Sequence, residues 1–276
     1  MNYKWILKLL GIIVLVFIIV LGYYTYIDYS PEEIEKVNIT RKNERAIKDE
    51  ITLLSWNIGY AGMGEKMDYF LDGGNRNNPS KDESEQNFNK IKNYLKQKEA
   101  DIYLLQEVDT GSKRSYFTDQ YKEIQNIFKN YNSAYALNFV NPYILLPLSD
   151  PVGQVHAGVT IFSKFDPTSA KRIQLPGQYK WPKSLMALDR CMLEMRFPYK
   201  DEEIVVINTH NSAFDKGNLK KMQMKYIKEK AIKEYKKGNY VIIGGDWNMI
   251  FPGVAFDAFS SKQRVPEWTI KINEDI

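Results

Sequence analysis

The chain has 276 residues, of which 44% are hydrophobic and 26% charged. This composition supplies enough apolar material for a packed core and excludes a disordered or fibrous protein. The 38 Lys and Arg residues against 34 Asp and Glu give a formal net charge of +4, which is too small to identify a nucleic-acid-binding protein by charge alone. The only cysteine, Cys191, excludes an intrachain disulfide framework and a cysteine-rich zinc site.

Residues 1–29 are predicted to form an N-terminal membrane anchor. Residues 9–27 carry no charge, and as a helix they would rise roughly 28 Å, close to a bilayer core of about 30 Å. The end of this segment, residues 23–27, lacks the small residues of a cleavage site, which favours an uncleaved anchor over a signal peptide. Lys4 and Lys8 precede the span and acidic residues follow it, so the positive-inside rule predicts a single-pass protein of the cell membrane whose main domain is extracytoplasmic.

Residues 30–49 are predicted to be a stalk or linker, because they are rich in charge and their few apolar residues show no long periodic stripe. The folded domain is expected to cover residues 50–276, where strand-like and helix-like segments alternate. Strands are expected at 51–58, 101–108, 134–140, 157–163, 191–197, 204–209 and 240–245. Helices are expected at 83–98, 114–129 and 218–236.

Polar side chains follow four of the predicted strands, at the point where each apolar run stops. They are Asn57, Gln106, Glu107, Asn208, Thr209, His210, Asp246 and Asn248. A strand that is buried on both faces must deliver its polar groups at its exit or leave them unsatisfied. We therefore expect these groups to converge at one rim of the sheets, as a candidate catalytic site.

The motifs around these residues resemble those of the endonuclease/exonuclease/phosphatase (DNase I-like) superfamily. The matching segments occur in the superfamily's order and are SWNIG at 55–59, LLQEVD at 104–109, GVTIFSK at 158–164, NTHNS at 208–212 and GGDWN at 244–248. The resemblance implies a DNase I-like four-layered α/β sandwich, in which two packed β-sheets have helices outside. It also implies a metal-dependent phosphoric ester hydrolase of the phosphodiesterase, nuclease or phosphatase type.

Glu107 is the expected metal ligand. Hydrolysis of a phosphodiester needs a cation on the phosphate, and Mg²⁺ prefers one or two carboxylates together with waters and substrate oxygens. By resemblance, Asn57 assists Glu107 at the metal, which we expect to be Mg²⁺, with Mn²⁺ as an alternative. The competing interpretation of Glu107 is a strand-end charge paired with a lysine.

His210, Asp246 and Asn248 are the expected catalytic residues. Alternation along an extended segment would point Asp246 and Asn248 the same way. The resemblance implies that Asp246 orients or activates the attacking water, that Asn248 holds a phosphate oxygen and that His210 donates to the scissile phosphate. The competing interpretations are an Asx turn and a hydrogen-bonded core histidine. His156 and Arg190 are weaker candidates for phosphate binding, against a loop histidine and a strand-edge arginine.

The chain departs from the resemblance after Asn248. Members of the superfamily normally continue with further strands that carry an Asp and a Ser-Asp-His motif, but only 28 residues follow Asn248 and none is a histidine. Residues 265–276 stop in mid-pattern, so we expect a C-terminally truncated fragment or a natural variant, with an incomplete sandwich and very low turnover.

The substrate class stays open among nucleic acid, nucleotide and phospholipid head group, and no protein partner is predicted. The alternative function is a non-catalytic anchored domain that binds a phosphorylated ligand or partner.

Overall fold

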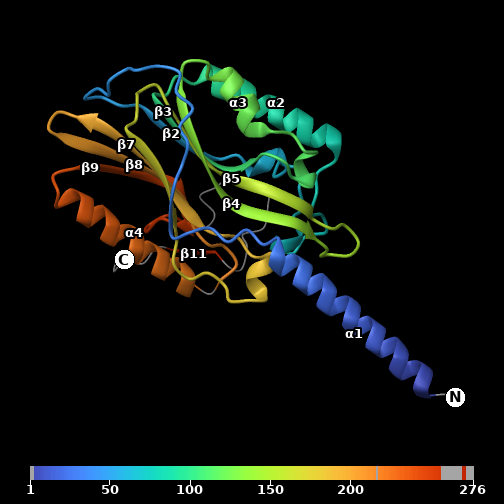
Figure 1. Cartoon of the computed structure of the whole chain (residues 1–276). Helices are drawn as coiled ribbons and strands as arrows, with labels where there is room; N and C mark the ends of the chain where they lie inside the picture. Colours follow the sequence, from blue (N-terminus) through green and yellow to red (C-terminus); the bar gives the residue numbers. More distant parts are fainter. Residues whose placement is uncertain (1–2, 216, 256–268, 272–276) are drawn as a thin grey trace.

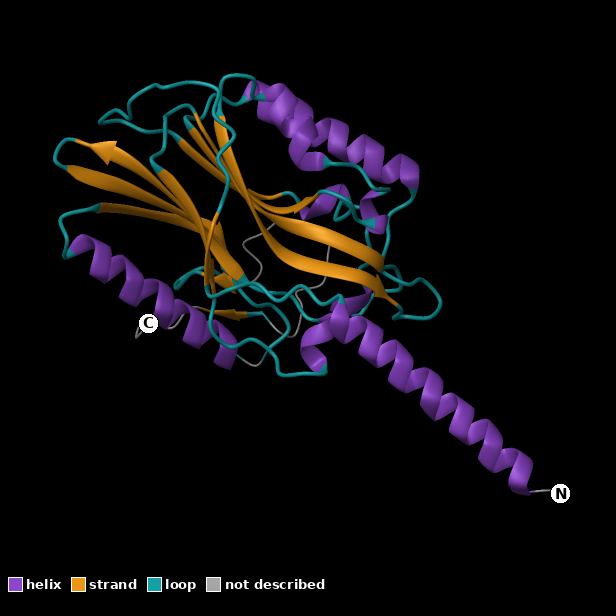
Figure 2. Ribbon diagram, viewed as in Figure 1, coloured by secondary structure: helices purple, strands orange, loops and turns teal. Residues whose placement is uncertain are grey.

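The computed structural model describes residues 3–215, 217–255 and 269–271. They form two β-sheets that pack face to face, with helices against both outer faces and one long helix that projects from the body (Figure 1, Figure 2). This is the DNase I-like α/β sandwich that the sequence predicts. Of the predicted mid-pattern stretch at 265–276, only 269–271 lies among the described residues.

The first sheet has the strand order β2-β3-β5-β4. Its strands are β2 (Leu53–Asn57), β3 (Ile102–Asp109), β4 (Asn132–Ile144) and β5 (Gly153–Ser163). β2 runs parallel to β3, whereas β5 is antiparallel to both β3 and β4. The parallel pair is connected through α2, and α2 and α3 cover the outer face of this sheet. These helices span Lys81–Gln97 and Gln120–Ile127.

The second sheet has the order β1-β6-β7-β8-β9. Its strands are β1 (Ile34–Lys36), β6 (Ser169–Gln174), β7 (Cys191–Tyr199), β8 (Glu202–His210) and β9 (Tyr240–Asp246). β8 and β9 form a parallel pair connected through α4 (Asn218–Tyr235), which packs on the outer face of this sheet. A separate short pair joins β10 (Met249–Ile250) to β11 (Ile270–Lys271). Short 3-10 turns are η1 (Gly59–Ala61), η2 (Phe70–Asp72), η3 (Lys113–Ser115) and η4 (Lys183–Met186).

The main core lies between the two sheets. Alternation along each strand sends one set of apolar side chains inward, including Leu104 and Ile161 from the first sheet and Leu193 and Val206 from the second. The opposite set meets the helices. Because both faces of the central strands are covered, these strands are nearly continuous apolar runs, and polar residues occur where the runs stop.

The long projecting helix is α1, Tyr3–Tyr26. Among the described residues it is the one helix that is long and apolar enough to cross a membrane. None of its residues is buried against the rest of the chain, and Figure 1 shows it leading away from the two sheets. Its length and composition agree with the predicted anchor.

Residues 30–49 do not form the free stalk that the sequence predicts. β1 pairs with β6 at the edge of the second sheet, and Thr40 forms a bridge to Ser133. Three apolar side chains of this segment pack against the core between the sheets, namely Val37, Ile39 and Ile47. The segment gives no periodic signal because its partners are distant in the sequence, and the folded unit takes in residues 34–49.

The helix predicted at 114–129 begins later, at Gln120. Lys113–Ser115 forms a 3-10 turn, and the two residues after it have positive φ angles of 54° and 59°. A left-handed backbone does not continue into an α-helix. Arg114 is therefore held in a loop after β3, close to the end of that strand.

Candidate active site

The carboxyl ends of β2, β3, β8 and β9 lie at one rim of the sandwich. Each parallel pair presents its carboxyl ends at one edge, and the register sets Asn57 opposite Gln106 and His210 opposite Asp246. A cavity of about 710 Å³ opens at this rim. Its polar lining includes Asn57, Glu107, Arg114, Arg190, His210, Asp246 and Asn248. Of the polar residues expected to converge, Asn57, Glu107, His210, Asp246 and Asn248 line this cavity, whereas Gln106, Asn208 and Thr209 do not.

Glu107 reaches the cavity because β3 is irregular at its end. The register between β3 and β5 shifts between Leu105 and Val108, and Glu107 has a φ of 53°. In a regular strand Glu107 would point the same way as Leu105, toward the layer covered by α2 and α3. The bulge turns the carboxylate into the cavity instead, at the cost of a backbone conformation that non-glycine residues seldom adopt.

Asn57 holds two carboxylates together. Its Nδ2 group donates to Glu107 Oε1 over 3.0 Å and to Asp246 Oδ2 over 2.7 Å. Its Oδ1 atom accepts from the Gly59 N–H over 2.9 Å, which fixes which side of the amide faces the carboxylates. In this arrangement Asn57 presents its nitrogen, not its oxygen, and so positions Glu107 and Asp246.

Asp246 and Asn248 form the Asx turn that the sequence leaves as an alternative. The Asp246 Oδ1 atom accepts from the Asn248 N–H over 2.8 Å, and Asn248 has a φ of 51°. The Asn248 side chain donates to the Asn211 carbonyl over 2.8 Å. Both residues still line the cavity. The turn, rather than the alternation of an extended segment, brings them there.

His210 is buried at the end of β8 with its ring near both carboxylates. Its Nε2 atom lies 3.7 Å from Asp246 Oδ2 and 3.9 Å from Glu107 Oε1. Within the described part of the chain its buried Nδ1 atom has no hydrogen-bond partner, which does not fit a satisfied core histidine. Burial and the charge of Arg190 lower its pKa, so the ring is neutral near pH 7.

The carboxylates have opposite pKa shifts. Burial raises the pKa of Glu107, and the charge of Asp246 adds to this against the opposing effect of Arg114. Burial would also raise the pKa of Asp246, but hydrogen bonds from Asn57 and the Asn248 backbone, together with the charge of Arg190, hold it below its ordinary value. Two close carboxylates that share one donor would be stabilised by a cation between them and the substrate.

The donors present fit a hard divalent ion such as Mg²⁺ or Mn²⁺. They are carboxylate oxygens, and hydrogen bonds occupy only part of the Glu107 carboxylate. No group of three His, Cys, Asp or Glu side chains in the described ranges could hold a metal by itself. An ion here would therefore keep waters or substrate oxygens in its coordination sphere, as Mg²⁺ commonly does.

Arg190 lines the same cavity. Its side chain is buried, and its Nη1 atom has no hydrogen-bond partner among the described residues. The strand-edge interpretation is wrong, because Arg190 directly precedes β7, which lies between β6 and β8 inside the sheet. A buried guanidinium with an unused donor beside a cavity is suited to phosphate oxygens.

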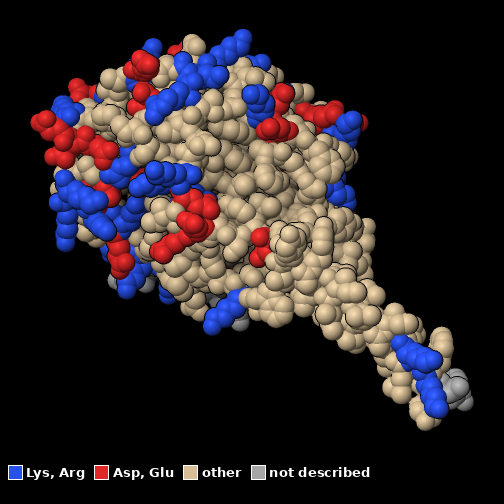
Figure 3. All heavy atoms as spheres, viewed as in Figure 1, with Lys and Arg blue, Asp and Glu red and all other residues tan. Residues whose placement is uncertain are grey.

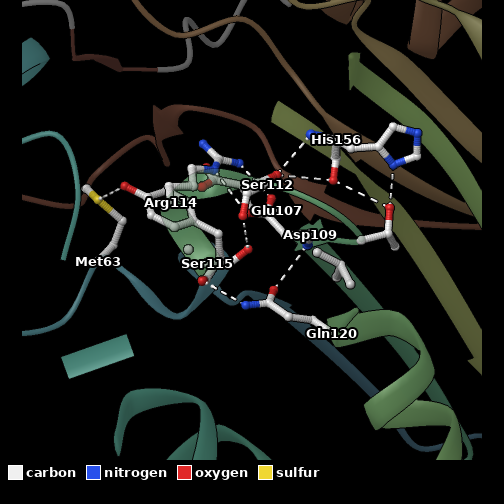
Figure 4. Close-up of polar contacts among 12 residues, drawn as sticks. Met63, Glu107, Asp109, Ser112, Arg114, Ser115, Gln120 and His156 are labelled. Atoms are coloured by element: carbon white, nitrogen blue, oxygen red, sulfur yellow. Dashed lines mark hydrogen bonds and ion pairs between the residues drawn. The ribbon is translucent and has the colours of Figure 1, made fainter. Parts of the chain in front are cut away.

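Arg114 is a site residue that sequence reasoning missed. Its guanidinium donates to both carboxylate oxygens of Asp109, over 3.1 and 2.9 Å, and lies 3.8 Å from the centre of the Tyr60 ring (Figure 4). The sequence predicts a helix at 114–129, and this prediction places Arg114 in a helix instead of in the loop after β3. The available signal was Asp109, two residues after Glu107, because a fully buried carboxylate needs a cationic partner.

The structure does not bring His156 to the cavity. Its Nδ1 atom lies 2.5 Å from Thr110 Oγ1, and its backbone bonds to the Ser112 hydroxyl. In Figure 4 the imidazole points away from Glu107 and Arg114. His156 is thus engaged in fixing the loop after β3.

The sequence pattern of the Endonuclease/Exonuclease/phosphatase family matches residues 54–270, and the chain belongs to this family. The match begins in β2 and extends through every residue of the cavity named above. No curated protein sequence matches the chain.

Solved structures resemble the chain at low sequence identity. One is ANGEL2, a 2',3'-cyclic phosphatase, which is 19% identical with a TM-score of 0.50, over 79% of this chain and 57% of that chain. Another is TDP2 from D. rerio in complex with a single-strand DNA product, 13% identical with a TM-score of 0.45, over 73% of this chain and 62% of that one. TDP2 from Caenorhabditis elegans is 18% identical with a TM-score of 0.46, over 79% and 51%. The chain thus spans little more than half the length of ANGEL2.

Proposed function

We propose that this chain is a membrane-anchored, divalent-metal-dependent hydrolase of phosphoric esters. The observation that carries the proposal is the convergence of Asn57, Glu107, His210 and Asp246 in one cavity, from four strands of two sheets. Membership of a family that is named for nucleases and phosphatases supports the same chemistry. The length and apolar composition of α1 support the anchor, with the domain on the extracytoplasmic side.

Glu107 would hold the metal, with its carboxylate kept in position by the Asn57 amide. A bound Mg²⁺ or Mn²⁺ would neutralise charge on the phosphate and make its phosphorus a better electrophile. Arg190 would add a positive charge at the phosphate through its unused Nη1 donor. Arg114 stays paired with Asp109 and keeps the end of β3 in place.

Asp246 and His210 divide the proton chemistry. Because its pKa is held low, Asp246 is ionised at neutral pH and can orient an attacking water and accept its proton. Neutral His210 keeps one N–H, which can donate to a phosphate oxygen and stabilise the charge that develops there. Asn248, fixed by its bond to the Asn211 carbonyl, can hold a second phosphate oxygen through the turn it forms with Asp246.

The substitution Glu107→Gln tests the proposal. It preserves shape and the contact with Asn57 but removes the charge that would bind the metal, so we expect hydrolysis of bis(p-nitrophenyl) phosphate with Mg²⁺ to fall about 100-fold or more. The control is Glu229→Gln on the exposed surface of α4, which should match the wild type. Circular dichroism of both variants checks that the fold is kept.

Two outcomes would contradict the proposal in different ways. Equal activity in E107Q and the wild type would remove Glu107 from the mechanism. A wild-type chain that binds Mg²⁺ and a phosphate ester in calorimetry, yet cleaves neither soluble nor membrane esters, would instead support the non-catalytic binding domain.

A further inference from the structure

The cavity has a polar floor and an apolar mouth. Beyond the site residues, much of its lining is hydrophobic, including Phe70, Leu71, Ile144, Leu146, Met186 and Phe214. The Lys and Arg side chains among its described lining residues are Arg114 and Arg190, and both are buried. A groove that tracks a nucleic-acid backbone uses exposed basic side chains along its length. This mouth has instead the character of a surface that meets hydrocarbon.

The apolar mouth continues into the loop between β4 and β5. We call residues 145–148 the hairpin tip. Leu145, Leu146 and Leu148 are 51%, 59% and 72% exposed, and Leu146 also lines the cavity. Single exposed leucines are ordinary on a soluble surface, but a cluster of three at one tip marks a site of interaction.

The base of the hairpin lies against the end of α1. The Tyr24 hydroxyl of α1 donates to the Tyr143 carbonyl over 2.7 Å, and the Trp181 indole donates to Thr25 Oγ1 over 3.0 Å. Figure 1 shows the β4-β5 connection and the base of α1 side by side. If α1 crosses a bilayer, the hairpin tip is therefore held at the surface of that same bilayer.

The surface around the base of α1 has the composition of a membrane interface. In Figure 3 the charged side chains crowd the part of the domain far from α1, and few lie around its base. Trp181 is 58% exposed there, and the Lys183 ammonium lies 3.8 Å from the centre of the Tyr179 ring. Tyr, Trp and Lys side chains are favoured where an apolar body meets hydrocarbon and a polar end meets water.

We infer that the hairpin tip and Trp181 dock into the membrane that holds α1, and that the cavity takes the phosphoric ester of a membrane phospholipid. The inference rests on the proposed function, because it assigns a substrate class to the same site. Tethering by α1 keeps the tip at a high local concentration near the lipid, so a small apolar surface suffices for docking. Docking brings the apolar mouth against the acyl chains and leaves the head-group phosphate facing the polar floor.

A single label tests the docking. Cys191 is the only cysteine and is buried, so Leu148→Cys supplies one reactive thiol for an environment-sensitive NBD fluorophore. The full chain is placed in vesicles of phosphatidylcholine, sphingomyelin and phosphatidylglycerol, with and without brominated lipid. We expect blue-shifted emission and strong quenching by the brominated lipid.

The matched control is Tyr235→Cys, at the end of α4 that Figure 1 places far from α1, where the side chain is 77% exposed. Its label should stay in water and remain unquenched. Equal quenching at positions 148 and 235 would overturn the docking. This readout needs no catalysis, so it decides the docking even if the chain hydrolyses nothing.

Substrate class is tested with Leu145→Ser/Leu148→Ser, because neither leucine lines the cavity. We expect cleavage of phospholipid in the vesicles to fall about 10-fold, while cleavage of soluble bis(p-nitrophenyl) phosphate is unchanged. E107Q should lose both activities, which separates a failed docking from a failed hydrolase. A wild-type chain that cleaves the soluble diester or a single-stranded oligonucleotide, but no membrane phospholipid, would overturn the substrate class.

Discussion

Unusual backbone conformations occur at the residues that form the candidate site. Glu107 and Asn248 have φ angles of 53° and 51°, and Gly245, beside Asp246, has a φ of 142°. Non-glycine residues at positive φ cost free energy that the surrounding structure must offset. At Glu107 and Asn248 this conformation turns the side chain away from the regular direction of its strand and toward the cavity.

Gly245 gives a prediction at this scale. A Cβ atom there would lie 2.0 Å from the Thr209 carbonyl oxygen, and φ is unfavourable for any L side chain. We expect Gly245→Ala to destabilise the domain by about 3 kcal/mol and to lower hydrolysis by displacing Asp246. The measurement is urea unfolding followed by circular dichroism.

Gly111→Ala is the matched control, because a Cβ there would meet the His156 and Gln154 side chains at ordinary distances of 3.7 and 4.0 Å. Its unfolding midpoint should stay close to that of the wild type. Equal midpoints for G245A and G111A would mean that the close approach to Thr209 is not a constraint in solution.

Sequence reasoning located the cavity residues whose position follows from strand ends. Asn57, Glu107, His210 and Asp246 each follow an apolar run, and the parallel pairing of their strands brings them together. Arg114 was not found, because its place depends on two left-handed residues and on Asp109, neither of which has a periodic signal.

At the scale of elements, α4 is fixed to the second sheet by a buried ionic cluster. Glu234, at the end of the helix, accepts from Arg196 of β7 over 2.8 Å and from Asn239 over 2.7 Å. Burial alone would raise the pKa of Glu234, but the hydrogen bonds from these and from Lys237 lower it to about 2. The helix that leads into β9, and so to Asp246, depends on a carboxylate that stays ionised.

This cluster predicts how stability depends on pH. The folded pKa of Glu234 lies below its ordinary 4.5, so its contribution is complete above pH 4.5 and is lost as the pH falls toward 2. At pH 3 the loss from this one group is about 2 kcal/mol. We expect Glu234→Gln to be less stable than the wild type at pH 7 but to lose about 2 kcal/mol less between pH 7 and pH 3.

Urea unfolding at the two pH values measures the difference, with the exposed Glu229→Gln as control. If E234Q lost as much stability on acidification as the wild type does, Glu234 would not be the titrating group.

The elements that the sequence missed are held by distant partners. Buried central strands such as β3 and β8 are long apolar runs and were predicted. β6 contains Arg172, which is buried because its guanidinium donates to the Leu137 and Asp189 carbonyls. No local sequence pattern indicates that distant carbonyls accept hydrogen bonds from Arg172. The sequence therefore predicts no strand at β6 and a stalk or linker at its partner β1.

At the scale of the whole molecule, one buried amide pair fixes the two sheets relative to each other. Gln106 Nε2 of β3 donates to Asn208 Oδ1 of β8 over 2.7 Å. The Asn208 amide in turn donates to the Leu105 and Thr160 carbonyls of the first sheet, each over 2.9 Å. Buried amides of this kind hold one register, because a slip would leave several polar groups unsatisfied. Glu107 and His210 therefore meet at a fixed offset.

The whole molecule also divides into a domain and the apolar helix α1, and the proposed membrane span of α1 can be tested by removing residues 1–27. The side-chain hydrogen bonds lost from the folded domain are those of Tyr24 and Thr25, both at the exposed base of α1. We expect the unfolding free energy of the domain to change by less than about 1 kcal/mol, because exposed contacts contribute little. The full chain should stay with vesicles through a sodium carbonate wash, whereas the shortened chain, held by the hairpin tip alone, should be released. Release of the full chain by the same wash would show that α1 does not span the bilayer.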